Sequence, residues 1–352
     1  MRVLWFNLAT DLDDPLLAFT NSWIREVATR VDSIHVITMR LGRVELPKNV
    51  RIYSVGKEKG FNEPRRALEF YRHLLRILHH EAIDVCFSHM IPIFTVMAAP
   101  LLRLRGIPIV TWYAHRSISV MLKLSHHLSS RMVSVNAASY PYFKDKFVPL
   151  GHGIDTSLFS PASAACSDLI LSVGRLSPIK DLDTLLQALV PLRNQGIFSQ
   201  CVLVGGSPPH HLPYAEKLRQ MAQRLGLEKL VRFSGPASQL EVVSWYRRCA
   251  VHVSCSPRNN AIDKAPLEAM ACGVPSLSSA EGYRETFGRY ADDLLFPQGN
   301  AKKLAERLSR LLSLSAAERQ EMGAYLRQQV IQHHTLEQLA GRIVGLLREI
   351  SG

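Results

Sequence analysis

Short apolar runs and longer amphipathic segments alternate along almost the whole chain. The apolar runs predict strands, which in the first half fall at residues 3–6, 34–38, 50–55, 84–87, 108–112, 132–135 and 147–148. Segments with a helical period lie between them, for example at 16–31 and 95–105. This alternation is typical of an α/β fold in which a parallel sheet carries helices on both faces.

The pattern breaks at residues 151–167, where Gly, Ser, Pro and Ala replace the periodic residues, and restarts at 169. We therefore expect two doubly wound, Rossmann-like domains at 1–158 and 159–334. A last amphipathic helix at 335–352 is expected to pack back on the first domain. Because ligands bind at the carboxyl ends of strands in such sheets, the site is expected in a cleft between facing domains.

Composition agrees with two globular domains, since 352 residues exceed what a single hydrophobic core usually serves. The most apolar run, at 90–102, contains Pro92 and Pro100 and stops at Arg103, which argues against a membrane span. The six cysteines show no CxxC pairing. We expect a cytoplasmic protein with reduced core thiols.

The net charge is +12, and nearly all of the positive surplus in the first half of the chain lies at residues 40–80. Within this stretch, 64–80 reads as an amphipathic helix. Its predicted apolar face comprises Ala67, Phe70, Tyr71, Leu74, Leu75 and Leu78, and its polar face Arg65, Glu69, Arg72, Arg76 and His80. The helix is either a crossover helix with a solvated face or a segment attracted to an anionic membrane surface. Nucleic acid is not favoured, because no base-stacking or reader motif accompanies the charge.

The segment KAPLEAMACGVP, residues 264–275, predicts a short helix after the apolar strand 251–253. Asp263 is a suitable N-cap residue. A strand, a polar loop and a helix N-terminus in this order form a corner that can bind an anion. Glu268, one turn inside the helix, could accept hydrogen bonds from ribose hydroxyls, or could be a solvated glutamate.

A second candidate segment follows the strand 169–173, which ends in Gly174 and is followed by Arg175 and then Lys180. An arginine fork and a lysine point charge together suit a diphosphate, although either cation alone is more often a surface charge. Gly205, after the strand 200–204, offers a further tight turn near the same sheet edge.

Several of these stretches resemble a known family. SVGRLSPIK, VRFSG, SWYRRCAVHVSCS and LEAMACGVP are similar in order and spacing to the C-terminal half of glycosyltransferase family 4. These are retaining nucleotide-sugar transferases with the GT-B fold. The resemblance extends over residues 169–297 and is looser in the first half, where it rests on GIPIVTWYAH and GHGIDTSLF.

The resemblance implies roles for particular residues. Arg175 and Lys180 would bind the donor diphosphate and stabilise the leaving nucleotide, so that neither a metal nor another cofactor is expected. Glu268 matches the second glutamate of the E-x7-E motif, which holds the ribose hydroxyls. Gly235 lies where the base packs, and His115 matches a histidine near the sugar and the acceptor.

The chain departs from the family pattern where the first glutamate of E-x7-E is expected, because that position is Asn260. The glycines that usually follow are also missing, because the run from Asn260 continues with Ala, Ile, Asp263 and Lys264. Asn260, Asp263 and Lys264 are donor-site candidates, and the identity of the sugar is left open. Asp263 either contacts the sugar or only caps the helix.

Candidates for the acceptor side lie in the first half. The glycine-rich turn expected after the first strand is replaced by a stretch containing Asp13 and Asp14, which could orient an acceptor hydroxyl or form a solvated turn. His89 follows a strand, and His152 stands between two glycines, so that each could reach the cleft or serve the local backbone.

The sequence therefore predicts transfer of a hexose-type sugar from a UDP- or GDP-linked donor to an acceptor hydroxyl. The acceptor is expected to be a cell-envelope or lipid-linked glycan, and the protein to associate peripherally with the inner face of the cytoplasmic membrane. Two alternatives stay open: a nucleotide-sugar epimerase of GT-B fold, and a non-catalytic partner subunit.

Overall fold

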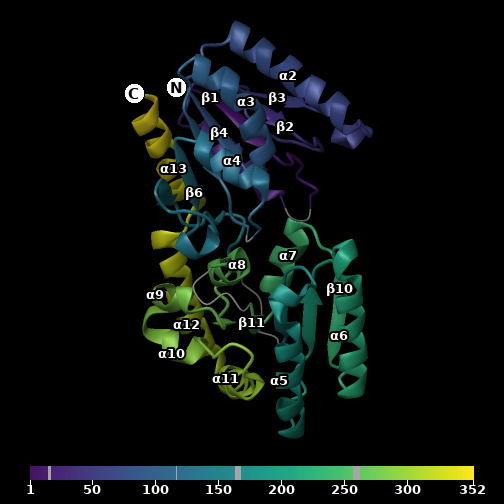
Figure 1. Cartoon of the computed structure of the whole chain (residues 1–352). Helices are drawn as coiled ribbons and strands as arrows, with labels where there is room; N and C mark the ends of the chain where they lie inside the picture. The colour runs from purple at the N-terminus through teal and green to yellow at the C-terminus, as the bar shows by residue number, and fades with distance from the viewer. Residues whose placement is uncertain (15–16, 116, 163–167, 257–261) are drawn as a thin grey trace. The chain divides into compact units, whose positions relative to one another are not determined.

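The computed structural model describes residues 1–14, 17–115, 117–162, 168–256 and 262–352, and it divides into two units. Unit 1 comprises Met1–Gly153 and Leu336–Gly352, and unit 2 comprises Ile154–Thr335 (Figure 1). The expected boundary at 158 falls inside unit 2. The chain already belongs to unit 2 at Ile154, because the Ile154 N–H donates to the carbonyl of His334 at 2.8 Å.

Unit 1 is built on a parallel sheet in the order β3-β2-β1-β4-β5-β6-β7. The strands are β1 (Arg2–Asn7), β2 (Ser33–Thr38), β3 (Val50–Ser54), β4 (Val85–His89), β5 (Ile109–Trp112), β6 (Arg131–Ser134) and β7 (Phe147–Pro149). The direction of winding reverses between β1 and β4. Residues that follow these two strands therefore lie at the switch point, where ligands bind in such folds.

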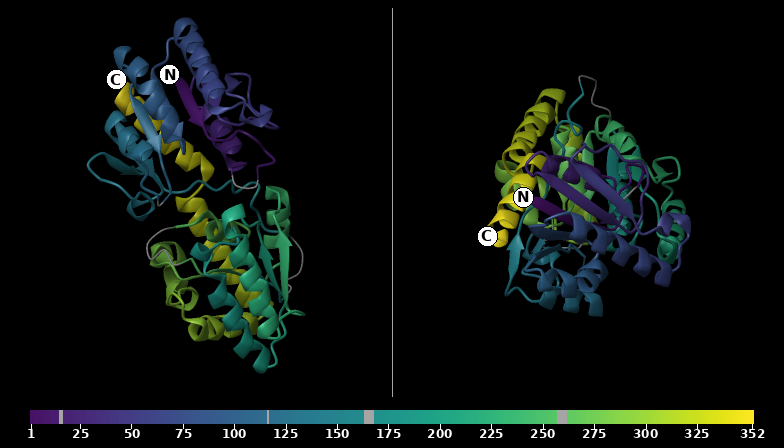
Figure 2. Two further views of the ribbon diagram at one scale, coloured as in Figure 1. Left: turned by 45° about the vertical axis from the view of Figure 1, so that its right-hand side comes forward. Right: turned by 90° about the horizontal axis from the view of Figure 1, so that it is seen from above.

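The helices of unit 1 are α1 (Phe19–Ala28), α2 (Glu63–His80), α3 (Pro92–Leu104), α4 (Val120–Leu128) and α13 (Leu336–Ser351). Phe6 of β1 packs against Phe70 of α2 and Phe94 of α3, which joins sheet and helices through a fully apolar core. Helix α13 packs against α1, and Arg348 donates to the carbonyl of Arg30 at 3.0 Å. Both chain ends consequently lie close together on unit 1 (Figure 2).

Helix α2 buries only part of the apolar face that the sequence pattern predicted. Asn62 caps its first turn by accepting the N–H of Arg65. The buried residues are Phe70, Leu74, Ile77 and Leu78. Tyr71 and Leu75, which were expected on the apolar face, are 38% and 50% exposed. Within the described residues, we find no helix that is both long enough and apolar enough to span a membrane.

Unit 2 carries a smaller parallel sheet in the order β10-β9-β8-β11-β12. Its strands are β8 (Ile170–Val173), β9 (Cys201–Val204), β10 (Val231–Gly235), β11 (Val251–Ser254) and β12 (Ser276–Ser278). Here the winding reverses between β8 and β11. The segments that follow β8 and β11 therefore meet at the switch point of this sheet.

The helices of unit 2 surround this sheet. They are α5 (Leu182–Asn194), α6 (Leu212–Arg224), α7 (Gln239–Tyr246), α8 (Lys264–Ala271), α9 (Arg284–Phe287), α10 (Ala291–Leu294), α11 (Ala301–Ser313) and α12 (Ala316–His333). Ser238 and Glu241 form a reciprocal capping box that starts α7. The two sheets and their helices confirm the α/β class that the alternating pattern predicts.

Candidate functional site

The predicted donor-side residues of unit 2 gather at the switch point between β8 and β11. Gly174 directly follows β8 with φ +152° and leads into Arg175. The next turn, the 3₁₀ helix η3 (Pro178–Lys180), ends at Lys180. Helix α8, with Glu268, is the helix that follows β11. The structure thus brings together side chains from two segments that are distant in the sequence.

Three predicted glycines lie at the ends of adjacent strands. The N–H of Gly174 donates to Val204, and the N–H of Gly205 donates to the carbonyl of Gly235 at 2.8 Å. A β-carbon at Gly205 would lie 1.9 Å from the carbonyl oxygen of Gly174, so no larger residue fits there. At Gly235 no described atom lies within 4 Å of the position that a β-carbon would occupy. Packing therefore requires glycine at position 205, whereas Gly174 is favoured by its positive φ and Gly235 leaves room beside the sheet edge.

A small pocket opens between these strand ends. Arg175 and Lys180 line it together with Ser254 and Cys255 at the end of β11. Among the residues that the structure describes, the guanidinium of Arg175 has no hydrogen-bond or ion-pair partner. A partly buried guanidinium with unused donors is suited to bind an anion that enters the pocket.

Lys180 is engaged by Asp263. Its Nζ donates to Oδ2 of Asp263 at 2.6 Å, and the two side chains are 21% and 18% exposed. Asp263 has the extended backbone of an N-cap residue, as the sequence predicts, but its side chain makes no capping hydrogen bond to α8. The prediction of a side-chain cap is therefore wrong, because the carboxylate points to the lysine instead.

Glu268 is held from α7. The hydroxyl of Tyr246 donates to the carbonyl of Ala265 at 3.1 Å and to Oε2 of Glu268 at 3.3 Å. Desolvation raises the pKa of Glu268, and the nearby Lys264 opposes this rise. Desolvation likewise lowers the pKa of Lys264. Because the two residues are four apart on one helix, the opposite charges support one another. Asn260 lies outside the described residues.

The sequence analysis missed two supporting tyrosines. Tyr246 lies within the quoted SWYRRCAVHVSCS stretch, and this motif was the available signal. Tyr283 receives the N–H of Asp263 and donates to its carbonyl, both at 2.6 Å. No local pattern marks Tyr283, because its partner lies in another loop.

In unit 1 the histidine candidates differ in exposure. His115 is exposed and its Nδ1 accepts the N–H of Ser117 at 3.1 Å. His89 is 1% exposed, with Nδ1 3.1 Å from Oδ1 of Asn7 and its ring 5.2 Å from that of Trp23. His152 is 8% exposed. We therefore keep His115 as an acceptor-side candidate and regard His89 as part of the core.

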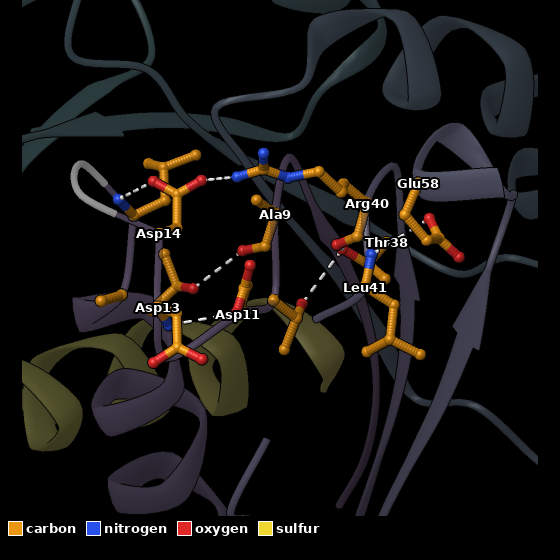
Figure 3. A network of polar contacts seen from close by, with 12 residues as sticks. Ala9, Asp11, Asp13, Asp14, Thr38, Arg40, Leu41 and Glu58 are labelled. Carbon is orange, nitrogen blue, oxygen red and sulfur yellow. Dashed lines mark hydrogen bonds and ion pairs between the residues drawn. The ribbon is translucent and has the colours of Figure 1, made fainter. Parts of the chain in front are cut away.

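Asp13 and Asp14 build the loop between β1 and α1. Asp14 is 8% exposed, pairs with Arg40 as Figure 3 shows, and accepts the N–H of Leu17 at 2.8 Å. Asp13 is exposed and forms two hydrogen bonds to Arg43, at 2.9 and 3.1 Å. These bonds lower the pKa of Asp13. Asp13 thus lies in a solvated turn, as one of the two interpretations expected, whereas Asp14 is buried. Both carboxylates stabilise the loop through their arginine partners.

Part of the chain is similar in sequence to known proteins. Residues 155–329 match the model of the family "Glycosyl transferases group 1". A D-inositol 3-phosphate glycosyltransferase of Frankia alni is 32% identical over 183 residues, which are 48% of this chain and 45% of that protein. A protein of the same name from Streptomyces bingchenggensis is 33% identical over 146 residues, 40% of this chain and 32% of that protein. The chain thus matches less than half the length of these relatives.

Solved structures match over nearly the full chain. Sucrose-phosphate synthase from Thermosynechococcus elongatus superimposes with a TM-score of 0.78 and 17% identity, covering 99% of each chain. Anabaena HepE, in complex with UDP and glucose, gives a TM-score of 0.76 and 17% identity, covering 99% of this chain and 100% of that one. At such low identity this likeness concerns the fold alone.

Residues 155–329 belong to the group 1 glycosyl transferases, and over this segment the predicted resemblance to a glycosyltransferase family is confirmed. Its two Rossmann-like units have the GT-B architecture.

Proposed function

We propose that the chain transfers a hexose-type sugar from a nucleoside diphosphate to an acceptor hydroxyl, with retention of the anomeric configuration. The observation that carries the proposal is the pocket at the switch point of unit 2, lined by both Arg175 and Lys180. Two cations at the carboxyl end of a parallel sheet are suited to a diphosphate. Glu268, held by Tyr246, would bind the ribose hydroxyls.

The chemistry follows from these charges. In the proposed step, the bond between the sugar C1 and the phosphate oxygen breaks while the acceptor oxygen bonds to C1 on the same face. The acceptor proton passes to the departing phosphate. Arg175 and Lys180 stabilise the negative charge that develops on the leaving group. We propose that they replace a metal ion in this role, so that activity persists in excess EDTA.

The donor is proposed to be UDP- or GDP-linked. Support comes from the fold neighbour HepE, which was solved in complex with UDP-glucose. On the acceptor side, the exposed His115 of unit 1 is the residue we propose to lie near the sugar and the acceptor.

The substitution Lys180→Ala tests the proposed role directly. With the diphosphate charge left uncompensated, release of nucleotide from UDP-glucose or GDP-mannose should fall by at least about a hundredfold, as for the loss of one charge-stabilising donor. The variant should keep the fold of the wild type by circular dichroism, although its melting temperature should fall because Asp263 loses its ion-pair partner. An active Lys180→Ala enzyme would remove the lysine from the mechanism.

We further propose that α2 attaches unit 1 to an anionic membrane surface, as a lipid-linked or envelope glycan acceptor would require. Leu68 and Leu75 on its outer face are 67% and 50% exposed. Arg65, Arg72 and Arg76 are exposed on the same helix. Apolar side chains among arginines favour an interface of lipid headgroups and acyl chains.

Flotation with vesicles measures this attachment. The protein should float with vesicles containing phosphatidylglycerol at low salt and dissociate at high salt. The double variant Leu68→Ser, Leu75→Ser should float less. Leu240→Ser is the matched control, because Leu240 is a 71% exposed leucine of unit 2. Flotation that is absent, or independent of salt and of these leucines, would refute the attachment.

A further inference from the structure

The ion pair between Lys180 and Asp263 gives Asp263 a role that the family pattern does not supply. The two residues come from the turn after β8 and from the residue that precedes α8, and their 2.6 Å bond links these two segments beside the pocket. Both side chains are about four-fifths buried, at 21% and 18% exposure. In such surroundings a charge pair is screened less than at the open surface.

Contacts constrain the backbone turn, the side-chain stem and the ammonium group of Lys180. Its Cε lies 3.2 Å from the point that a β-carbon of Gly174 would occupy, so that the stem runs directly over this glycine. The turn that carries it is held by Ser256, whose hydroxyl donates to the carbonyl of Ile179 at 3.2 Å. The ammonium group at the end of the stem is then fixed by Asp263.

Asp263 itself stands on a rigid support. The hydroxyl of Tyr283 bonds to both the N–H and the carbonyl of Asp263. Tyr283 is 1% exposed and its ring stacks on that of Phe287, with the centroids 5.5 Å apart. The backbone of Asp263, which carries the carboxylate, is thus anchored to the core of unit 2.

We propose that Asp263 is a positioning residue for Lys180, which presents the ammonium group to the donor diphosphate. An ammonium group has three N–H donors, and the bond to Asp263 uses one of them. The other two N–H groups are then available to the diphosphate. Because the side chain is already ordered, binding does not carry the loss of side-chain entropy that a flexible lysine would incur. This inference rests on the proposed function, because it needs a diphosphate in the pocket.

A competing arrangement makes the opposite prediction. If the ion pair with Asp263 had to break before a ligand could bind Lys180, the carboxylate would compete with the diphosphate for the ammonium group. Its removal would then tighten nucleotide binding. The sign of the change in the dissociation constant therefore separates a positioning residue from a competitor.

The experiment is a double-mutant cycle read by calorimetric titration with UDP and with GDP. Asp263→Ala should weaken binding of the preferred nucleotide about tenfold, equivalent to about 1.4 kcal/mol. Lys180→Ala should weaken it at least as much. The double variant should bind like Lys180→Ala alone, because Asp263 acts only through the lysine. Asp263→Asn, which keeps the shape and one acceptor, should show a smaller loss in the same direction.

Asp183→Ala is the matched control. Asp183 accepts from Lys217 at the same distance of 2.6 Å and is similarly buried, at 21% exposure, but its partner Lys217, unlike Lys180, does not line the pocket. It should leave nucleotide binding unchanged.

Three results would overturn the inference. Binding by Asp263→Ala that equals or exceeds that of the wild type would exclude positioning. Losses that multiply in the double variant would show that Asp263 acts independently of Lys180. A wild-type protein that binds neither nucleotide would remove the proposed function itself, and the inference with it.

Discussion

Gly205 packs against Gly174 so closely that a β-carbon at position 205 would lie 1.9 Å from the carbonyl oxygen of Gly174. Gly205 also has φ +146°, a conformation that other residues rarely adopt. Gly205→Ala should therefore force β8 and β9 apart at their carboxyl ends. We expect it to lower the free energy of unfolding by about 2 kcal/mol or more, and to weaken nucleotide binding.

Urea denaturation and titration with UDP and GDP measure both effects. Gly206→Ala serves as the control, because its β-carbon would lie at an ordinary 3.5 Å from Pro236. It should cost less than about 1 kcal/mol. Equal stability losses in the two variants would contradict the packing argument.

Tyr246→Phe should remove the hydrogen bond that Glu268 accepts from the tyrosine hydroxyl. The tyrosine is fully buried, and its hydroxyl donates to both Glu268 and the carbonyl of Ala265. Loss of these bonds should lower the free energy of unfolding by about 1 kcal/mol and raise the nucleotide dissociation constant several-fold. If Tyr246→Phe were less stable but bound nucleotide as well as the wild type, the hydroxyl would not position Glu268.

Arg327 fastens the start of unit 2 to α8. Its guanidinium donates to the carbonyls of Thr156 and Phe159, at 3.3 and 3.0 Å, and to that of Ala271. A lysine lacks this fork and would leave carbonyls unpaired. Arg327→Lys should lower the free energy of unfolding by about 1–3 kcal/mol, as measured by urea denaturation.

Arg310→Lys is its control, because Arg310 is a 58% exposed residue of α11 whose ion pair to Asp293 contributes little. A change below about 0.5 kcal/mol is expected there. An Arg327→Lys variant as stable as this control would show that the three carbonyls are satisfied in another way.

His252 makes the stability depend on pH. Burial lowers the pKa of this histidine in the folded protein to about 3, whereas about 6.5 is usual in an unfolded chain. Below pH 6.5 the unfolded chain binds a proton that the folded protein does not, so stability falls as the pH falls. Well above pH 6.5 the histidine is neutral in both states and costs no stability. At pH 5 its protonation in the unfolded chain lowers the free energy of unfolding by about 2 kcal/mol.

The variant His252→Asn, whose amide can replace Nδ1 beside Ser276, should lack this contribution. Between pH 7.5 and pH 5 the wild type should lose about 2 kcal/mol more than the variant in urea denaturation. The exposed His210→Asn should behave like the wild type. Parallel pH profiles for the wild type and His252→Asn would contradict this assignment.

The alternating pattern predicted most strands and helices, but α4 and β12 were missed for a physical reason. The buried residues of α4 are Leu122, Ser125 and His126, and His126 pairs with Tyr140 at 2.8 Å and Asp145 at 3.0 Å. In β12, two of the three buried residues are serines. Polar side chains satisfied inside the core leave no hydrophobic period to detect.

The sequence could predict those site residues whose place follows from the order of the strands. Arg175, Lys180 and Glu268 follow strands that a doubly wound sheet places together. Asp263 shows the limit of this reasoning, because an aspartate before a helix can cap it or bind a lysine from another loop. The local sequence does not choose between these, because the partner Lys180 is 83 residues away in the sequence.

The central claim is a nucleoside diphosphate site in unit 2, and melting curves with UDP, GDP, ADP and CMP test it most directly. One nucleotide at 100 times its dissociation constant should stabilise the wild type by about 2.7 kcal/mol. Glu268→Ala should lose most of this stabilisation. No shift with any of the four, or the same shift in the variant, would contradict the assignment of this pocket.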